Sequence, residues 1–194
     1  MTPSRAFDKL KEGNERFVQN TLKSRNWNTK VKLTASGQYP FATILGCMDS
    51  RAPSEIIFDQ GLGDIFTIRV AGNIVNEDIL GSMEYALKVA GSKLLVVMGH
   101  TECGAIKGAI DKVDLGNLTV LLDKITPAVN AVNYDGNKIS GDKPFVKLVT
   151  IKNIEMAIEE IRAKSEILKE MESKGEIKIV GALYDVATGK VSWL

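Results

Sequence analysis

The chain has 194 residues, and its 25 basic and 24 acidic side chains leave a formal net charge of +1. This length suits one domain with a sizeable core, and the 44% of hydrophobic residues is typical of a soluble globular protein. The balanced charge argues against nucleic acid or an anionic membrane as a partner. No apolar run approaches the roughly 20 residues of a membrane span, and no signal-peptide core is visible. We therefore expect a cytoplasmic protein.

The N-terminal residues predict a helix followed by an arm. Thr2 is a suitable N-cap and Pro3 a suitable first residue for a helix over residues 3–20. Residues 21–40 are polar and irregular, so we expect an extended connection there. The helix and arm, residues 1–36, pack either on the chain's own domain or on a partner subunit, and the pattern alone favours neither.

Strands and helices alternate in the rest of the chain. Short apolar runs predict strands at residues 41–45, 64–70, 93–98 and 177–184, with a last short strand at 191–193. Helices are predicted at residues 53–58, 76–90, 103–113, 117–132 and 145–173, with a loop at 133–144. The alternation indicates an α/β fold with a mainly parallel four-stranded central sheet, an extra C-terminal edge strand and helices on both faces. Without a repeat or linker, residues 1–194 are expected to form a single domain.

The only two cysteines and the only histidine of the chain follow two of these strands. Cys47 comes after the first strand, and His100 and Cys103 come after the third. Because open α/β sheets bind ligands at the carboxyl ends of their strands, we expect these side chains to converge. Two thiolates and an imidazole suit zinc, and catalytic zinc sites use three protein ligands plus an open position. The alternatives are ordinary buried side chains, or a Cys47–Cys103 disulfide, which is rare in a reducing cytosol.

Asp49 and Arg51 stand close to the first cysteine and two residues apart. In an extended turn they face the same side, where the guanidinium fork suits a bidentate carboxylate. A plain surface ion pair is one interpretation. The functional interpretation is that Asp49 accepts a hydrogen bond from metal-bound hydroxide or ligates the metal itself, and that Arg51 holds it off the metal.

Cys-x-Asp-x-Arg at 47–51 and His-x-x-Cys at 100–103 together resemble the β-class carbonic anhydrases. The similarity runs through about residues 37–110 and includes Asp-Ile-Phe-Thr-Ile-Arg-Val-Ala-Gly-Asn at 64–73. The resemblance implies a four-stranded parallel sheet, often with a fifth antiparallel edge strand. It also implies a homodimer or dimer of dimers in which the N-terminal helix lies across the partner.

The same resemblance implies an enzyme, a lyase that reversibly hydrates carbon dioxide to bicarbonate and a proton. One Zn²⁺ per chain would be held by Cys47, His100 and Cys103, and hydroxide on the metal would attack the carbon. Asp49 and Arg51 would be the catalytic pair.

Two positions bear on the sub-class within this family. Gln38 matches the glutamine with which the accessible-site, plant-type sub-class hydrogen-bonds its substrate. Ile44 stands where the closing, bicarbonate-regulated sub-class carries tryptophan. Both residues favour the accessible sub-class, although Gln38 by itself reads as an ordinary loop glutamine.

Four further residues match the family's substrate pocket: Phe66, Ala71, Tyr85 and Gly104. The first three correspond to an apolar wall for the uncharged substrate, and Ala71 is smaller than the aliphatic residue frequent there. Without the resemblance, Phe66 and Tyr85 would be interpreted as plain core.

Two other functions fit the same ligands. A hydrolase of carbon disulfide or carbonyl sulfide would keep the scaffold and differ in how the substrate enters. A non-catalytic zinc-binding protein would keep the metal with Asp49 closing the site permanently. The presence of Asp49, Arg51 and Gln38 together argues against the second of these.

Overall fold

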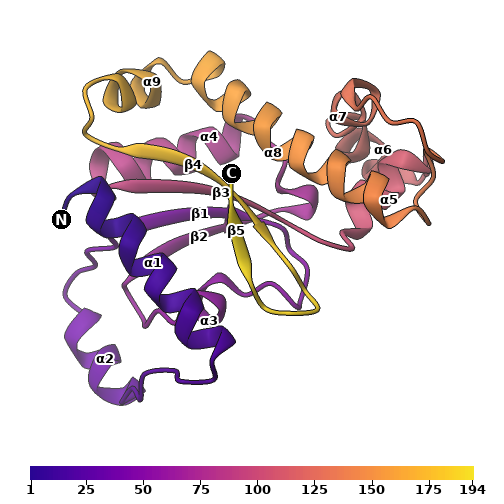
Figure 1. The fold of residues 1–194 in the computed structure, drawn as a ribbon. Helices are drawn as coiled ribbons and strands as arrows, with labels where there is room; N and C mark the ends of the chain where they lie inside the picture. The colour runs from indigo at the N-terminus through magenta and orange to yellow at the C-terminus, as the bar shows by residue number, and fades with distance from the viewer.

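The computed structural model describes residues 1–194, and its five strands form one sheet in the order β2-β1-β3-β4-β5 (Figure 1). Strands β1 (Ala42–Gly46), β2 (Ile65–Arg69), β3 (Leu94–His100) and β4 (Lys178–Tyr184) are parallel. The short β5 (Val191–Trp193) pairs antiparallel with β4. The predicted parallel sheet with an added C-terminal edge strand is confirmed.

Helices cover both faces of this sheet because alternate strand residues point to opposite sides. On one face Ile44, Val96 and Ala182 belong to a core cluster shared with α1 (Pro3–Val18) and α3 (Ser54–Ile57). On the other face Leu45 and Val97 pack with helices α4 (Glu77–Glu84), α8 (Lys143–Lys164) and α9 (Glu166–Ser173). Figure 1 shows these two layers on opposite sides of the strands. The prediction of a sheet with helices on both faces is correct.

A third core cluster lies beyond the carboxyl ends of the strands. It is built by α5 (Gly104–Ile110), α6 (Gly116–Asp123), α7 (Thr126–Ala131) and the start of α8. The single helix predicted over residues 117–132 is wrong, since the chain forms α6 and α7 there. Pro127 lacks the amide hydrogen that would continue the first helix, and it begins the second instead.

The helix predicted over residues 76–90 is present but not uniform. After α4 the chain forms one π-helical turn, Tyr85–Val89, and the helix ends at Gly91, which has a φ of +80°. A glycine adopts this left-handed conformation without the steric cost of a Cβ atom. No helix in the structure has both the length and the apolar character to cross a bilayer.

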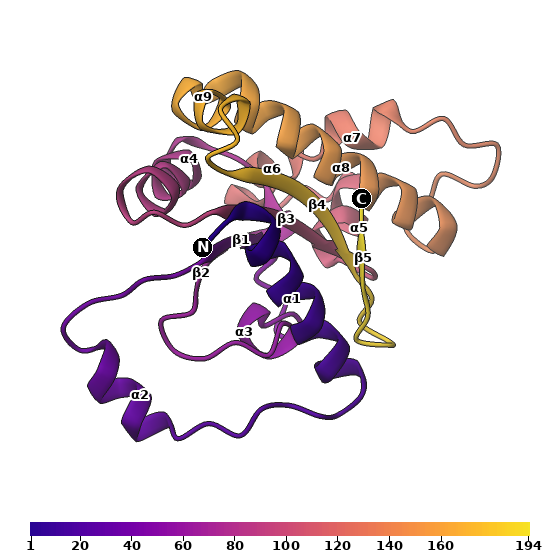
Figure 2. The same cartoon turned by 60° about the vertical axis from the view of Figure 1, so that its left-hand side comes forward.

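The arm contains a helix that the sequence pattern did not predict. Helix α2 (Trp27–Thr34) is capped by Asn26, whose side chain accepts from the backbone N–H of Thr29. It buries none of its residues, so it leaves no apolar stripe in the sequence. In Figure 2 it stands away from the sheet, partway along the arm.

Helix α1 packs on the chain's own core through Ala6 and Leu10, and Asn14 bonds to the β4–β5 turn. For this face the own-domain alternative therefore holds, and packing of the outer face on a partner stays a prediction. The buried Asp59 carboxylate pairs with Arg16 of α1 and Arg25 of the arm, which ties the start of the arm to the end of α3.

Candidate metal centre

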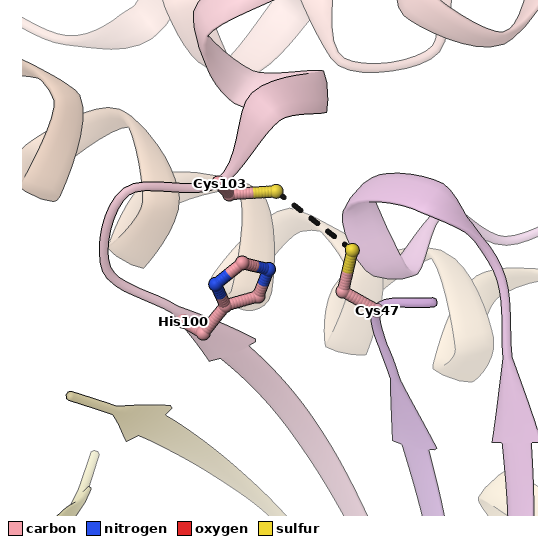
Figure 3. A group of neighbouring side chains, drawn as sticks. All are labelled: Cys47, His100 and Cys103. Atoms are coloured by element: carbon pink, nitrogen blue, oxygen red, sulfur yellow. Dashed lines mark hydrogen bonds between the residues drawn. The ribbon is translucent and has the colours of Figure 1, made fainter. Parts of the chain in front are cut away.

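The predicted ligands lie at the point where the order in which the chain adds strands to the sheet reverses. From β1 the chain passes outward to β2 and then returns to β3 on the other side of β1, so a crevice opens past the carboxyl ends of β1 and β3. Cys47 directly follows β1, His100 ends β3, and Cys103 precedes α5. Figure 3 shows the three side chains pointing toward one another, and their ligand atoms all lie within 4.8 Å.

The hydrogen bonds of these side chains leave free the atoms that a metal requires. His100 Nδ1 lies 2.9 Å from the Thr101 carbonyl oxygen, which can only accept, so the ring proton sits on Nδ1. The opposite nitrogen, Nε2, is buried without a hydrogen-bond partner. Buried polar atoms are normally paired, and a metal-binding histidine commonly shows this arrangement of its two nitrogens. The donor set and its geometry fit zinc.

The two cysteines are free thiols, with Sγ atoms 3.9 Å apart. Hydrogen bonds from the Cys103 thiol and from the backbone N–H groups of Gly72 and Asp49 lower the pKa of Cys47 to about 4. The Cys47 sulfur and burial both raise the pKa of Cys103. The protein alone thus stabilises one thiolate, and a second thiolate at this distance calls for a cation between them.

Asp49 and Arg51 form the bidentate pair expected from their spacing. Arg51 donates from Nε to Oδ1 of Asp49 at 2.9 Å and from a terminal nitrogen to Oδ2 at 2.8 Å. This pairing lowers the pKa of Asp49 to about 2. The carboxylate also faces the ligand group, since its Oδ2 lies 3.8 Å from Nε2 of His100.

Arg69 is a site residue that the sequence reasoning missed. At the end of β2 it donates from Nε to the carbonyl of Cys47 at 3.0 Å and from a terminal nitrogen to the carbonyl of Asp49 at 2.6 Å. Arg69 thereby fixes the turn that carries both Cys47 and Asp49. The sequence did offer a signal for this role. Arg69 is a charged residue near the end of a strand that was predicted to run parallel to the first.

The five predicted substrate residues do not gather in one place. Ala71 and Gly104 adjoin the ligands, as neighbours of Gly72, which bonds to Cys47, and of Cys103. Phe66 and Tyr85 contact each other, with ring centroids 6.3 Å apart, in a cavity of about 660 Å³ between β2 and α4. None of the three ligands lines that cavity. Gln38 is exposed in the segment between α2 and β1.

The chain is similar in sequence to known proteins. The family model described as carbonic anhydrase matches residues 42–191. Carbonic anhydrase 2 of Mycobacterium tuberculosis is 36% identical over 195 residues, covering 97% of this chain and 91% of the relative. A carbonic anhydrase of Mycolicibacterium smegmatis is 34% identical, and the alignment covers 97% of this chain and 92% of the relative.

Solved structures agree on the fold. A tetrameric β-carbonic anhydrase of Sordaria macrospora superposes with a TM-score of 0.73 at 24% identity, covering 86% of this chain and 90% of that one.

Proposed function

Since this chain belongs to the β-carbonic anhydrase family, we propose that Cys47, His100 and Cys103 hold one zinc ion in its active site. The enzyme catalyses the hydration of carbon dioxide to bicarbonate and a proton. The observation that carries the zinc proposal is the convergence of two thiols with an unpaired, buried imidazole nitrogen. Two thiolate ligands also agree with a cytoplasmic location, where thiols stay reduced.

A bound zinc ion supplies Lewis acidity, which makes water a competent nucleophile near neutral pH. The protein contributes orientation. Asp49, within reach of the ligand group, accepts a hydrogen bond from the nucleophilic water and selects its orientation. Arg51 aligns the Asp49 carboxylate, and Arg69 fixes the turn beneath it.

The accessible sub-class is the form that this geometry favours. Both carboxylate oxygens of Asp49 accept hydrogen bonds from the Arg51 guanidinium, which keeps the carboxylate from serving as a fourth ligand. Ile44 in β1 agrees with this assignment. We propose that Gln38, Phe66, Ala71, Tyr85 and Gly104, which match the substrate residues of that sub-class, contact the substrate, although Gln38, Phe66 and Tyr85 lie apart from the ligands of their own chain.

Zinc binding has a direct test. Purified protein is expected to contain one zinc ion per chain by elemental analysis. Chelation should abolish carbon dioxide hydration in a stopped-flow assay, and added zinc should restore it. Retention of full activity after complete zinc removal would contradict the proposal. A parallel hydrogen-sulfide assay tests the alternative substrates, carbon disulfide and carbonyl sulfide, which the match to relatives named carbonic anhydrase does not favour.

Self-association is supported by two open surfaces. Four apolar side chains of the arm, Trp27, Val31, Leu33 and Tyr39, are each more than half exposed. Strand β2 ends the sheet, so its outer edge has no partner strand. Exposed apolar clusters and open strand edges are typical of interfaces. The cavity that holds Phe66 and Tyr85 lies beside this edge, so a second copy docked there would bring both residues into an interface.

We therefore expect the protein to sediment as a dimer or a dimer of dimers, like the tetrameric relatives from Sordaria macrospora. A Val31→Glu/Leu33→Glu double variant should be monomeric, because two charges replace exposed apolar contacts in the interface. Sedimentation velocity measures the change. Ile139→Glu, at a similarly exposed apolar residue in the loop before α8, is the control and should leave the assembly intact. A monomeric wild-type protein at micromolar concentration would contradict the proposal.

A further inference from the structure

The sulfur of Cys47 receives a backbone hydrogen bond from outside its own turn. The N–H of Gly72 donates to Cys47 Sγ at 3.4 Å. A hydrogen bond to a thiolate withdraws charge from the sulfur and restricts its position. The residues that fix the Gly72 amide therefore act on this sulfur without touching it.

The Gly72 turn does not have a relaxed backbone. Gly72 and Asn73 both have positive φ, at 65° and 42°, within the 3₁₀ turn Ala71–Asn73. A Cβ atom on Gly72 would lie 2.5 Å from Cδ1 of Ile125 and would be strained at this positive φ, so glycine is strongly favoured here. Two consecutive left-handed residues, one of them not glycine, need support from the surrounding structure.

Asn153 of α8 supplies that support. Its Nδ2 donates to the carbonyl oxygen of Gly72 at 2.9 Å, across 81 residues of sequence. The side chain is 95% buried, on a helix face where the neighbouring buried residues, Thr150 and Ile154, make no bond to the turn. An amide in such a position is costly unless its hydrogen bonds are satisfied. The donor of the Asn153 amide is satisfied by the Gly72 turn.

We propose that Asn153 is a positioning residue for the metal centre, holding the Gly72 turn so that its N–H stays on the Cys47 sulfur. The inference deepens the proposed function and rests on it in one respect, namely that Cys47 is a metal ligand. Asn153 forms no hydrogen bond to the ligands or to the predicted substrate residues, so its effect travels through the Gly72 peptide groups.

Loss of the Asn153 donor should weaken metal binding and change the sulfur. Removal of an outer-shell partner typically reduces metal affinity or activity by about 10–100-fold. With Co²⁺ in place of zinc, a thiolate that has lost its hydrogen bond is more easily oxidised. The thiolate-to-cobalt charge-transfer band should then move to longer wavelength.

Two variants separate this role from simple packing. Asn153 lines a cavity of about 280 Å³ between α7 and α8, from which water can enter. In Asn153→Ala a water molecule can replace the lost donor, whereas the Asn153→Leu side chain fills the space and excludes it. Zinc affinity should therefore fall in the order wild type, Asn153→Ala, Asn153→Leu. A packing role predicts the reverse order for the two variants, because leucine fills the site better than alanine.

Asn14 is the matched control. It is as buried as Asn153 and bonds to Ile57, Gly189 and Val191, and its helix α1 packs on the face of the sheet opposite α8. Asn14→Leu should lower the unfolding temperature of the metal-free protein and leave both the zinc affinity and the cobalt band unchanged.

The measurements are zinc affinity by chelator competition, the cobalt spectrum, and the unfolding temperature of each metal-free variant. Wild-type affinity and an unshifted band in both Asn153 variants would overturn the inference and leave the zinc proposal standing. So would a loss of affinity in Asn14→Leu equal to that in Asn153→Leu. If Asn153→Leu does not fold, the position of the cobalt band in Asn153→Ala tests the inference, and an unshifted band overturns it. A wild-type protein that binds no zinc would overturn the proposed function itself.

Discussion

Cys103→Ser is expected to remove the metal and to lower kcat/KM for carbon dioxide hydration by at least about 1,000-fold. The Cys103 side chain is buried at the start of α5, and a serine hydroxyl there does not ionise to replace the thiolate. Without the metal, the water keeps its high bulk pKa and is no longer a competent nucleophile near neutral pH. Stopped-flow hydration and elemental analysis of the same preparations measure both effects.

Ala109→Ser is the control for this change. Ala109 lies on α5 in the same core cluster, so the variant buries a comparable hydroxyl without touching a ligand. It should keep the zinc content and most of the activity. Stoichiometric zinc and near wild-type rates in Cys103→Ser would show that Cys103 is not a ligand.

Asp49→Asn is expected to lower kcat/KM by about 100-fold while the zinc content stays at one per chain, since positioned proton acceptors typically contribute 10²–10⁴-fold. The variant keeps the size of the side chain but replaces an oxygen that accepts from Arg51 with an amide group that cannot accept. Both the alignment of residue 49 and its negative charge are lost. Metal content measured beside the rate separates this effect from ligand loss.

The unfolding free energies of wild type and Asp49→Asn at acid pH give an independent test of the Asp49–Arg51 pairing. The pKa of Asp49 is lowered in the folded protein from 3.8 to about 2. A lowered folded-state pKa stabilises the protein fully above the unfolded value, and this contribution is lost as the pH falls from about 4 toward 2. The difference in unfolding free energy between wild type and Asp49→Asn should therefore be constant from about pH 5 upward and shrink below about pH 4. A difference that changes around neutral pH would contradict the Asp49–Arg51 pairing.

The sequence by itself determined the fold class and the three candidate metal ligands. Short, fully apolar runs alternate with helical patterns along the chain. A strand of a parallel sheet is covered on both faces, so it needs such an apolar run. Cys47 and His100 follow two of those runs, and the rule that ligands bind past the carboxyl ends of strands then brings them together. Asp49 and Arg51 were within reach of prediction because their pairing depends on a spacing of two residues.

Local features without a core signature were not predicted. Helix α2 buries no residue, so its only sequence signal is the Asn26 cap, which is too weak to identify a helix. The division between α6 and α7 was signalled by Pro127, but the apolar spacing continues across it.

Only the tertiary structure decided which distant groups support the metal centre. Arg69 reaches Cys47 and Asp49 from the end of β2, and Asn153 reaches the Gly72 turn from α8, across 81 residues. Only the tertiary structure also showed that Phe66 and Tyr85 lie in a cavity apart from the ligands. Periodicity and spacing encode which face of an element is apolar. A hydrogen bond to a backbone amide or carbonyl leaves no such pattern, because its partner is chosen by the way the strands and helices pack.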